Sequence, residues 1–367
     1  MPDAGRAEVR IQTTTTWEGS VKFSMVTMSD IAKQARVSLT TVSFVLNGGA
    51  TANQIGAATR LRVLAVASEM GYRRNGLAHA VAAGKNPVFG YLTVELSEQD
   101  SLLLDGILRE SASAGYHVKL LGRGEDEHGF EVARHCVEQR LAGLIIRRHS
   151  AAVAVCEELE SYHIPVVFVD DNRDRPGVGC VGSDDRQGYR LAVEHLIGLG
   201  HRSIAYLAGD FSLPQEILRG ESFHNVMSAH GLLVPKSWAA GCGWSYERLD
   251  TLTRALFQGA LDYPTALLCD GDPLAAVAIR TLSTMGLRVP HDVSVVGYGD
   301  FSLAELLNPP LTTVAQPFQD MGRAAVRQLL HAVEGDPGSG SDGPYKTEML
   351  TTCLVRRAST APARSGI

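Results

Sequence analysis

The chain has 367 residues and a formal net charge of −6, and 45% of its residues are hydrophobic while 20% are charged. This is the composition of an ordinary globular protein with room for two or three domains. No apolar run is long enough to cross a membrane, and residues 1–24 lack the hydrophobic segment of a secretory signal. We therefore expect a cytoplasmic protein without a membrane partner.

Residues 1–24 have the composition of a disordered N-terminal extension, and either Met25 or Met28 could be the true start. The six cysteines show no C-x-x-C spacing, so we expect six reduced thiols, no disulfide and no metal site. We also expect no cofactor.

The stretch 26–47, VTMSDIAKQARVSLTTVSFVLN, has the pattern of two short helices joined by a tight turn. Thr27 is suited to cap the first helix, with Asp30 as the reciprocal half of a capping box. Ser38 is suited to cap the second helix. Helices this short are unstable alone, so they must pack on each other and on a third helix, which the pattern predicts over residues 59–70. The sequence therefore predicts a helix-turn-helix unit.

Helical periodicity divides this unit into an inner and an outer side. The side chains expected to point inward are Ile31, Ala32 and Ala35 in the first helix, Val42, Val45 and Leu46 in the second, and Leu61, Leu64, Ala65 and Ala67 in the third. The side chains expected to face outward on the second helix are Leu39, Thr40, Ser43 and Phe44.

Charge is unevenly spread along the chain. Residues 25–86 carry seven Lys and Arg side chains against two acidic ones, so the acidic excess lies from Pro87 onward. A small basic module joined to a large acidic one is typical of a DNA reader attached to a domain that does not touch DNA.

Residues 74–86 are small and poor in apolar bulk, and they could form a linker or a short helix that depends on a partner surface. From Pro87, short apolar strands alternate with helical segments, which indicates parallel α/β layering. The alternation of strands and helices begins again after about Gly182, so we expect two lobes with a cleft between them. We also expect one final strand over residues 347–357. Ligands of such sheets bind beyond the carboxyl ends of the strands.

The segment VTMSDIAKQARVSLTTVSFVLNG followed by GYRRNGLAHAV resembles the LacI/GalR family of bacterial transcription regulators. The resemblance continues through IPVVFVD, VGSDDRQGYRLAVEHLIGLGHRSIAYLAG, MGLRVPHDVSVVGYGD and NPPLTTVAQP. It implies an α/β fold with an N-terminal three-helix helix-turn-helix headpiece plus hinge, then a two-lobed periplasmic-binding-protein-like core with parallel sheets. The implied domains are an extension at 1–24, a DNA-binding domain at 25–73, a hinge at 74–86 and an effector-binding and dimerisation core at 87–367, whose first lobe spans about 87–166 with a return near 300–333.

The family also implies a function. It predicts a homodimeric repressor that binds a palindromic operator in double-stranded DNA and is controlled by a small effector, sugar-like or nucleoside-like, in the interlobe cleft. The alternatives of activator against repressor, and of inducer against co-repressor, stay open.

By position in the resemblance, Leu39 and Thr40 would face base edges in the major groove. Phe44 would make apolar contact, for example with a thymine methyl, or would pack against the linker. The residues implied to serve the phosphate backbone are Ser38, Thr41, Ser43 and Asn47, with Thr27 beside them. In the hinge, Val81 lies at the position of a minor-groove wedge, next to Ala78 and His79, or it joins two hinge segments.

The implied effector ligands lie in the core. Arg219 would clamp the ligand with its guanidinium fork, and Trp244 would cover a flat or apolar face. Asp170 and Asp272 follow strands at their carboxyl ends and would face the cleft, although for Asp272 we favour capping of the following loop.

The chain departs from the family after VSVVGY, where Gly299 replaces the usual Asp. Either Asp300 takes over the role of that carboxylate, or the ligand lacks the hydroxyl pair that it would bind. Effector identity therefore cannot be carried over.

A free periplasmic binding protein and an enzyme are the two alternatives to a regulator. A free periplasmic binding protein would share the core but would need an export signal and no headpiece. An enzyme would need a catalytic constellation, and the sequence has no P-loop, no G-x-S-x-G and no metal-ligand spacing. We therefore expect a regulator and not an enzyme.

Overall fold

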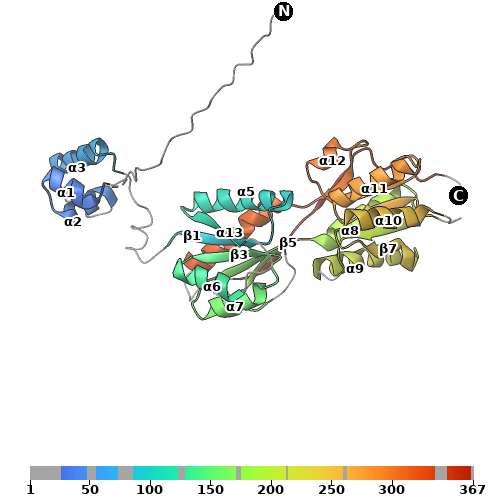
Figure 1. Cartoon of the computed structure of the whole chain (residues 1–367), viewed down its shortest axis with the longest axis horizontal. Coiled ribbons are helices and arrows are strands. Elements are labelled where there is room, and N and C mark those ends of the chain that lie inside the picture. Colours follow the sequence, from blue (N-terminus) through green and yellow to red (C-terminus); the bar gives the residue numbers. More distant parts are fainter. Residues whose placement is uncertain are drawn as a thin grey trace, which may run out of the picture. The chain divides into compact units, whose positions relative to one another are not determined.

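The computed structural model describes residues 26–47, 55–72, 86–122, 129–170, 175–211, 214–258, 263–334 and 345–364. The chain divides into two compact units between His79 and Ala80 (Figure 1). Hinge residues 74–85 lie outside the described ranges.

The N-terminal unit is a three-helix headpiece. Its helices are α1 (Met28–Ala35), α2 (Leu39–Asn47) and α3 (Ala57–Glu69). Thr27 accepts the Asp30 amide at 3.3 Å, and the Asp30 carboxylate accepts the Thr27 amide at 2.9 Å, so the expected capping box is present. Arg36 ends α1 in the left-handed conformation, with φ of 53°, and this turns the chain into α2. The predicted helix-turn-helix unit is confirmed.

The core of the headpiece is small. Its buried side chains are Ile31, Ala32, Ala35, Val42, Val45, Val63 and Ala67. The expectation for α3 was wrong at three positions, because Leu61, Leu64 and Ala65 are exposed. The inward face instead follows positions 63, 66, 67 and 70, which have the i, i+3, i+4, i+7 spacing of a helix packed along one side.

The second unit contains two sheets, one parallel and one parallel except for a single edge strand, and each is covered by helices. The first lobe consists of β1 (Val88–Thr93), α5 (Glu98–Ser113), β2 (His117–Leu121), α6 (Gly129–Glu138), β3 (Gly143–Arg147), α7 (Ala152–Glu160), β4 (Val166–Val169), β5 (Gly179–Ser183), α13 (Phe318–Glu334) and β11 (Thr347–Leu350). The second lobe consists of α8 (Asp185–Gly198), β6 (Ile204–Ala208), α9 (Pro214–Ala229), η2 (Lys236–Trp238), β7 (Ala239–Gly241), α10 (Tyr246–Phe257), β8 (Ala266–Cys269), α11 (Asp272–Thr284), β9 (Ser294–Gly299), α12 (Leu303–Leu306), β10 (Thr312–Ala315) and β12 (Cys353–Val355).

The strand orders show how the chain winds. The first sheet has the order β11-β5-β4-β3-β1-β2, and all of its pairs are parallel. The second has the order β12-β10-β9-β8-β6-β7, with only β12 antiparallel to its neighbour. Helices α5 and α13 cover one face of the first sheet and α6 and α7 cover the other (Figure 1). Strands buried on both faces explain the continuous apolar runs in the sequence.

Three segments cross between the lobes. They follow β5, follow β10 and join β11 to β12. The chain stays in the first lobe through Ser183 and returns at Phe318. The single final strand expected at residues 347–357 was wrong, because residues 351–352 interrupt it and send its halves to different sheets. Within the described ranges, no helix is both long and apolar enough to span a membrane.

Candidate ligand cleft and DNA-reading surface

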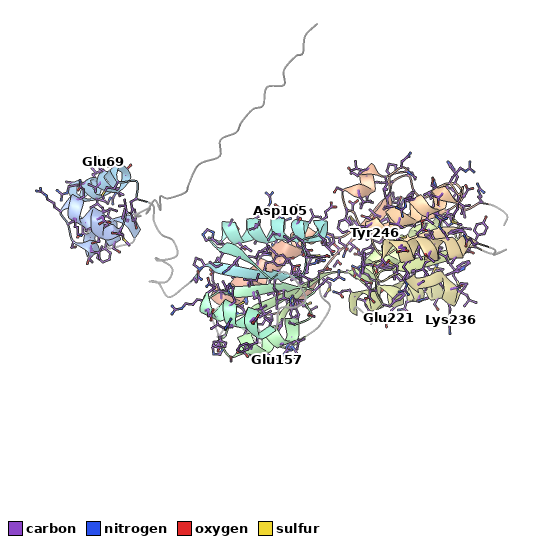
Figure 2. All side chains as sticks on the ribbon, viewed as in Figure 1. Glu69, Asp105, Glu157, Glu221, Lys236 and Tyr246 are labelled. Atoms are coloured by element: carbon purple, nitrogen blue, oxygen red, sulfur yellow. The ribbon has the colours of Figure 1, made fainter. Side chains whose placement is uncertain are left out.

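A cavity of about 630 Å³ lies between the lobes, at the carboxyl ends of the two sheets. That volume is in the range of small-molecule binding sites. Figure 2 shows Tyr246, one of its lining residues, on the side of the second lobe that faces the first. The described residues that line it are Thr93, Val94, Glu95, Ser97, Glu98, Gln99, Arg147, Arg148, His149 and Ser150 from the first lobe, and Gln215, Arg219, Trp244, Tyr246, Asp270, Gly271, Pro273, Tyr298, Phe301 and Gln316 from the second.

On the first lobe, Arg147 ends β3 and is 4% exposed. Its guanidinium lies 2.6 Å from the Asp100 carboxylate and 3.1 Å from that of Asp170. Burial alone would raise the pKa of Asp100, but the charge of Arg147 and hydrogen bonds from neighbouring hydroxyls, including Ser97, outweigh it, so the pKa is lowered. The group is a buried ion cluster in which one guanidinium pairs with two carboxylates.

On the second lobe, Arg219 of α9 has the same arrangement. Its guanidinium is 2.7 Å from the Asp185 carboxylate and 3.1 Å from that of Asp270, and it lies 4.8 Å from the centre of the Tyr298 ring. Asp270 directly follows β8, is 2% exposed and lines the cavity. Burial raises the pKa of Asp270 even though Arg219 opposes this effect.

Trp244 has a φ of 58° and is 39% exposed. A Cβ on Gly271 would lie 3.4 Å from its ring, so part of the indole packs on bare backbone. Its indole N–H donates to Glu216 at 2.9 Å. Glu216 is 1% exposed, and burial together with the nearby charge of Asp270 raises its pKa to about 7. The indole, which lines the cavity, is therefore anchored by Glu216.

Glu216 also connects the lobes. Its carboxylate lies 3.6 Å from the guanidinium of Arg148, which belongs to the first lobe. Two further interlobe contacts flank the cleft: Ser302 donates to Glu98, and the Gln215 amide donates to the carbonyl of Asp170 at 2.8 Å.

Of the five effector residues expected from sequence, Arg219 and Trp244 line the cavity. Asp170 is not among the described lining residues, because its carboxylate is engaged by Arg147 and by the Gln99 amide at 2.9 Å.

Asp272 and Asp300 are likewise not among the described lining residues. Asp272 accepts the Phe301 amide at 2.7 Å and the Thr313 hydroxyl at 2.5 Å, and burial raises its pKa to about 6. Asp300 lies 2.7 Å from the guanidinium of Arg357. Asp272 thus binds the loop after β9 and strand β10, and not the loop that follows its own strand, which we favoured from the sequence.

At Gly299, which has no side chain, the ring of Phe301 lies against the backbone. Gly299 has a φ of 124°, and a Cβ there would lie 2.6 Å from a ring carbon of Phe301. Phe301 stacks on Phe318 with ring centres 5.8 Å apart and lines the cavity. An aromatic ring therefore fills the space where the family usually places a carboxylate.

Sequence reasoning missed Asp270, Arg147 and Glu216. Asp270 stands in the same CDGD segment as Asp272, and its position directly after β8 was the available signal, because ligands meet the first residue beyond a strand. Within the described residues, no cluster of His, Cys, Asp and Glu could hold a metal ion.

On the headpiece, the N-terminal half of α2 presents an exposed surface. Leu39 is 54% exposed and Phe44 is 39% exposed, with Thr40 exposed between them. Ser38 accepts the Thr41 amide at 3.1 Å and so caps the helix. The remaining expected residues are placed as follows: Thr27 caps α1, Ser43 is half-buried, and the side chain of Asn47 together with Ala78, His79 and Val81 lies outside the description.

These sites match known proteins. The model for bacterial regulatory proteins of the lacI family matches residues 27–75, and the periplasmic binding protein-like domain matches residues 193–360. The lactose operon repressor of Escherichia coli (strain K12) is 31% identical over 341 residues, which cover 91% of each chain. The structure of the lac repressor dimer bound to operator and the anti-inducer ONPF has a TM-score of 0.79 at 29% identity and covers 92% of this chain and 99% of that one. The transcriptional regulator CelR in complex with cellobiose has a TM-score of 0.67 at 25% identity, with 91% and 99% covered.

The headpiece and the cleft-bearing core together define a DNA-binding transcriptional regulator with an effector-binding domain, and not an enzyme. The chain belongs to the LacI family of bacterial regulatory proteins, as its sequence predicted. The predicted fold class is also confirmed.

Proposed function

We propose that this protein is a repressor that binds a palindromic operator as a homodimer and responds to a sugar-like or nucleoside-like effector in the interlobe cleft. One observation carries the proposal: the chain combines two separate units. The first is a headpiece with the exposed helix α2, and the second is a two-lobed core around a cavity of about 630 Å³. The lac repressor dimer bound to operator, which matches 92% of this chain, supports it.

The reading surface on α2 favours apolar contact with DNA. Leu39 and Phe44 have no side-chain hydrogen-bond donor, so they would contact thymine methyl groups and would not read guanine. Thr40 supplies the hydroxyl that would reach a base edge. Ser38 and Thr41, at the helix N-terminus, would position the headpiece on phosphates.

The hinge contacts proposed for Ala78, His79 and Val81 follow from the resemblance alone. In that reading Val81 wedges into the minor groove, where a short β-branched side chain opens a base step less than leucine would.

In the core, Arg219 and Trp244 would receive the effector, and Asp170, Asp272 and Asp300 would support the residues around it. A ligand between the lobes would compete with or strengthen the contacts from Arg148 to Glu216 and from Ser302 to Glu98. The lobes would then change their relative angle, and the spacing of the two headpieces in a dimer would match or mismatch the operator half-sites. The effector shifts this equilibrium only by its different affinity for the two states.

The test is selection of duplexes from a random library with the full-length chain, followed by gel-shift assays at moderate ionic strength. We expect a palindromic consensus, a dimer in the complex and no shift by a chain that begins at residue 87. Thr40→Ala should change the preferred base at one position in each half-site, whereas Ser68→Ala, exposed on α3, should leave the consensus unchanged. A monomer without preference for any duplex would refute the proposal.

The effector half of the proposal has its own test. Trp244→Ala should abolish the response of operator binding to the effector while basal operator binding persists. A full response in this variant would place the ligand elsewhere.

A further inference from the structure

The turn between α1 and α2 contains an arginine where the backbone geometry favours glycine. Arg36 has a φ of 53°, and the amide of the next residue, Val37, donates to the carbonyl of Ala32 at 3.1 Å. This is the Schellman ending of an α-helix. Its left-handed residue is most often glycine, because the Cβ of any other residue is crowded in that conformation.

Other helices of the chain show what this ending normally contains. In the described ranges, five helices end with the same backward hydrogen bond and have a glycine at the left-handed position, with φ between 65° and 91°. These glycines are Gly71 after α3, Gly115 after α5, Gly200 after α8, Gly231 after α9 and Gly286 after α11. Because α3 belongs to the same headpiece as α1, the small domain itself does not exclude glycine from this position.

The strain alone does not assign a role to the side chain. Arg140 after α6, with φ of 50°, and His163 after α7, with φ of 54°, occupy the same kind of position in the first lobe. A left-handed residue other than glycine costs free energy wherever it occurs. What distinguishes Arg36 from these two residues is therefore its surroundings.

Arg36 is exposed and stands two residues before Ser38, which caps α2. Consecutive Cα atoms are about 3.8 Å apart, so the Cα atom of Arg36 lies within about 11 Å of that of Leu39, the first residue of α2. The turn thus carries a guanidinium next to the end of α2 that exposes Leu39 and Thr40.

This end of the headpiece has few other positive charges. Helix α2 contains no lysine or arginine. In α1, hydrogen bonds from Thr27 and, less strongly, the charge of Lys33 lower the pKa of Asp30, so Lys33 already faces a carboxylate. Among the described residues, no hydrogen bond or ion pair engages the guanidinium of Arg36.

The contacts already proposed for Ser38 and Thr41 cannot replace such a charge. Neutral hydroxyl groups can hydrogen-bond to phosphates and fix the position of a helix, but they release no counterions from DNA. A guanidinium supplies the charge and also forms two parallel hydrogen bonds with a phosphate.

We propose that Arg36 binds a phosphate of the operator backbone beside the N-terminal end of α2 and so fixes the register of α2 in the major groove. This inference rests on the proposed function and adds a residue to its DNA-binding surface. The left-handed turn gives up backbone stability and places the cation at the end of the helix that meets the bases.

The test measures fluorescence anisotropy of the full-length protein with two labelled duplexes, the selected operator and a random sequence of equal length, at several KCl concentrations. In Arg36→Gln, the slope of log K against log [KCl] should become shallower by about 0.9 for each headpiece, or about 1.8 for a dimer. The loss of affinity should therefore shrink about 12-fold between 0.05 M and 0.2 M KCl. It should be equal for both duplexes, because a phosphate contact carries no sequence information.

Two further variants separate charge from backbone. Arg36→Lys keeps the charge and should retain most of the wild-type slope. Arg36→Gly should weaken DNA binding as Arg36→Gln does, and yet it should raise the melting temperature of the headpiece in circular dichroism by a few degrees, because glycine suits the turn. A merely structural role would instead move stability and binding in the same direction.

The matched control is Arg140→Gln, which removes the same charge from the same kind of turn in the core. It should leave both affinities and the salt slope unchanged. An equal loss in this control would show a general effect of net charge and would overturn the proposal.

Two other results would also overturn it. One is an unchanged salt slope in Arg36→Gln, and the other is a loss confined to the operator, which would mean that Arg36 reads a base. If the wild type selects an operator while either result is found, only the role of Arg36 is rejected. A wild type without preference for any duplex would reject the proposed function and this proposal with it.

Discussion

The carboxyl group of Glu216 allows a quantitative prediction about stability and pH. It is 1% exposed, it accepts the Trp244 indole N–H, and its pKa is raised from 4.5 to about 7 by burial and by Asp270. The other groups that face it are Arg148 from the first lobe and Arg219 from its own helix. We expect Glu216→Gln to remove a pH dependence from the stability of the second lobe.

The sign follows from proton uptake. Between pH 4.5 and about 7 the folded protein binds more protons at Glu216 than the unfolded chain does, so this group makes stability fall as pH rises. At 1.36 kcal/mol for each pKa unit, the wild type should lose about 2.5 kcal/mol relative to the variant between pH 5 and pH 8. The stabilisation is greatest in acid and is lost as pH rises through the folded pKa.

The assay is urea unfolding at four pH values from 5 to 8, followed by tryptophan fluorescence. Two of the three tryptophans, Trp238 and Trp244, lie in the second lobe, so in a Trp17→Phe background the signal reports the part of the protein that contains Glu216. Glu221→Gln, on the exposed side of the same helix, should keep the wild-type slope. Equal pH slopes for wild type and Glu216→Gln would refute the reasoning.

Two further predictions concern backbone geometry. Ser38→Ala should lower the stability of the headpiece by about 1 kcal/mol, because Ser38 caps α2 by accepting the Thr41 amide; an unchanged melting transition of the headpiece in circular dichroism would contradict this. Gly299→Ala should cost about 1–3 kcal/mol, because φ is 124° and the added Cβ would lie 2.6 Å from the Phe301 ring; an unaltered urea midpoint would show that Phe301 moves freely aside.

The sequence predicted those parts of the fold that depend on interactions between residues close together in the chain, such as helix starts and the type of each element. Thr27, Asp30 and Ser38 mark the helix starts by hydrogen bonds that only such side chains make, and the structure contains them. The alternation of apolar strands with helices was equally readable, because each element has its own hydrophobic period.

Packing between elements was less predictable. Helix α3 carries apolar residues on two faces, so periodicity alone could not show that Val63 is buried while Leu61 is exposed. The carboxylates of the cleft raise the same difficulty. Asp270 and Asp272 are two residues apart, and only the fold shows that one lines the cavity while the other binds the loop at Phe301.

The three crossing segments between the lobes are tied to one another. Gln316, in the second crossing, donates at 2.7 Å to Ser183, the last residue of β5 before the first crossing. The amide of Asp184, in the first crossing, donates at 2.7 Å to the carbonyl of Leu350, the last residue of β11 before the third. A single connection would let one lobe rotate in any direction, whereas three laterally bonded connections oppose torsion and leave bending as the easiest displacement. If the lobes can move only by bending toward or away from each other, the core can occupy a few discrete arrangements of its two lobes. We expect the insertion of one residue in any of the three crossing segments to weaken the hydrogen bonds that join all of them.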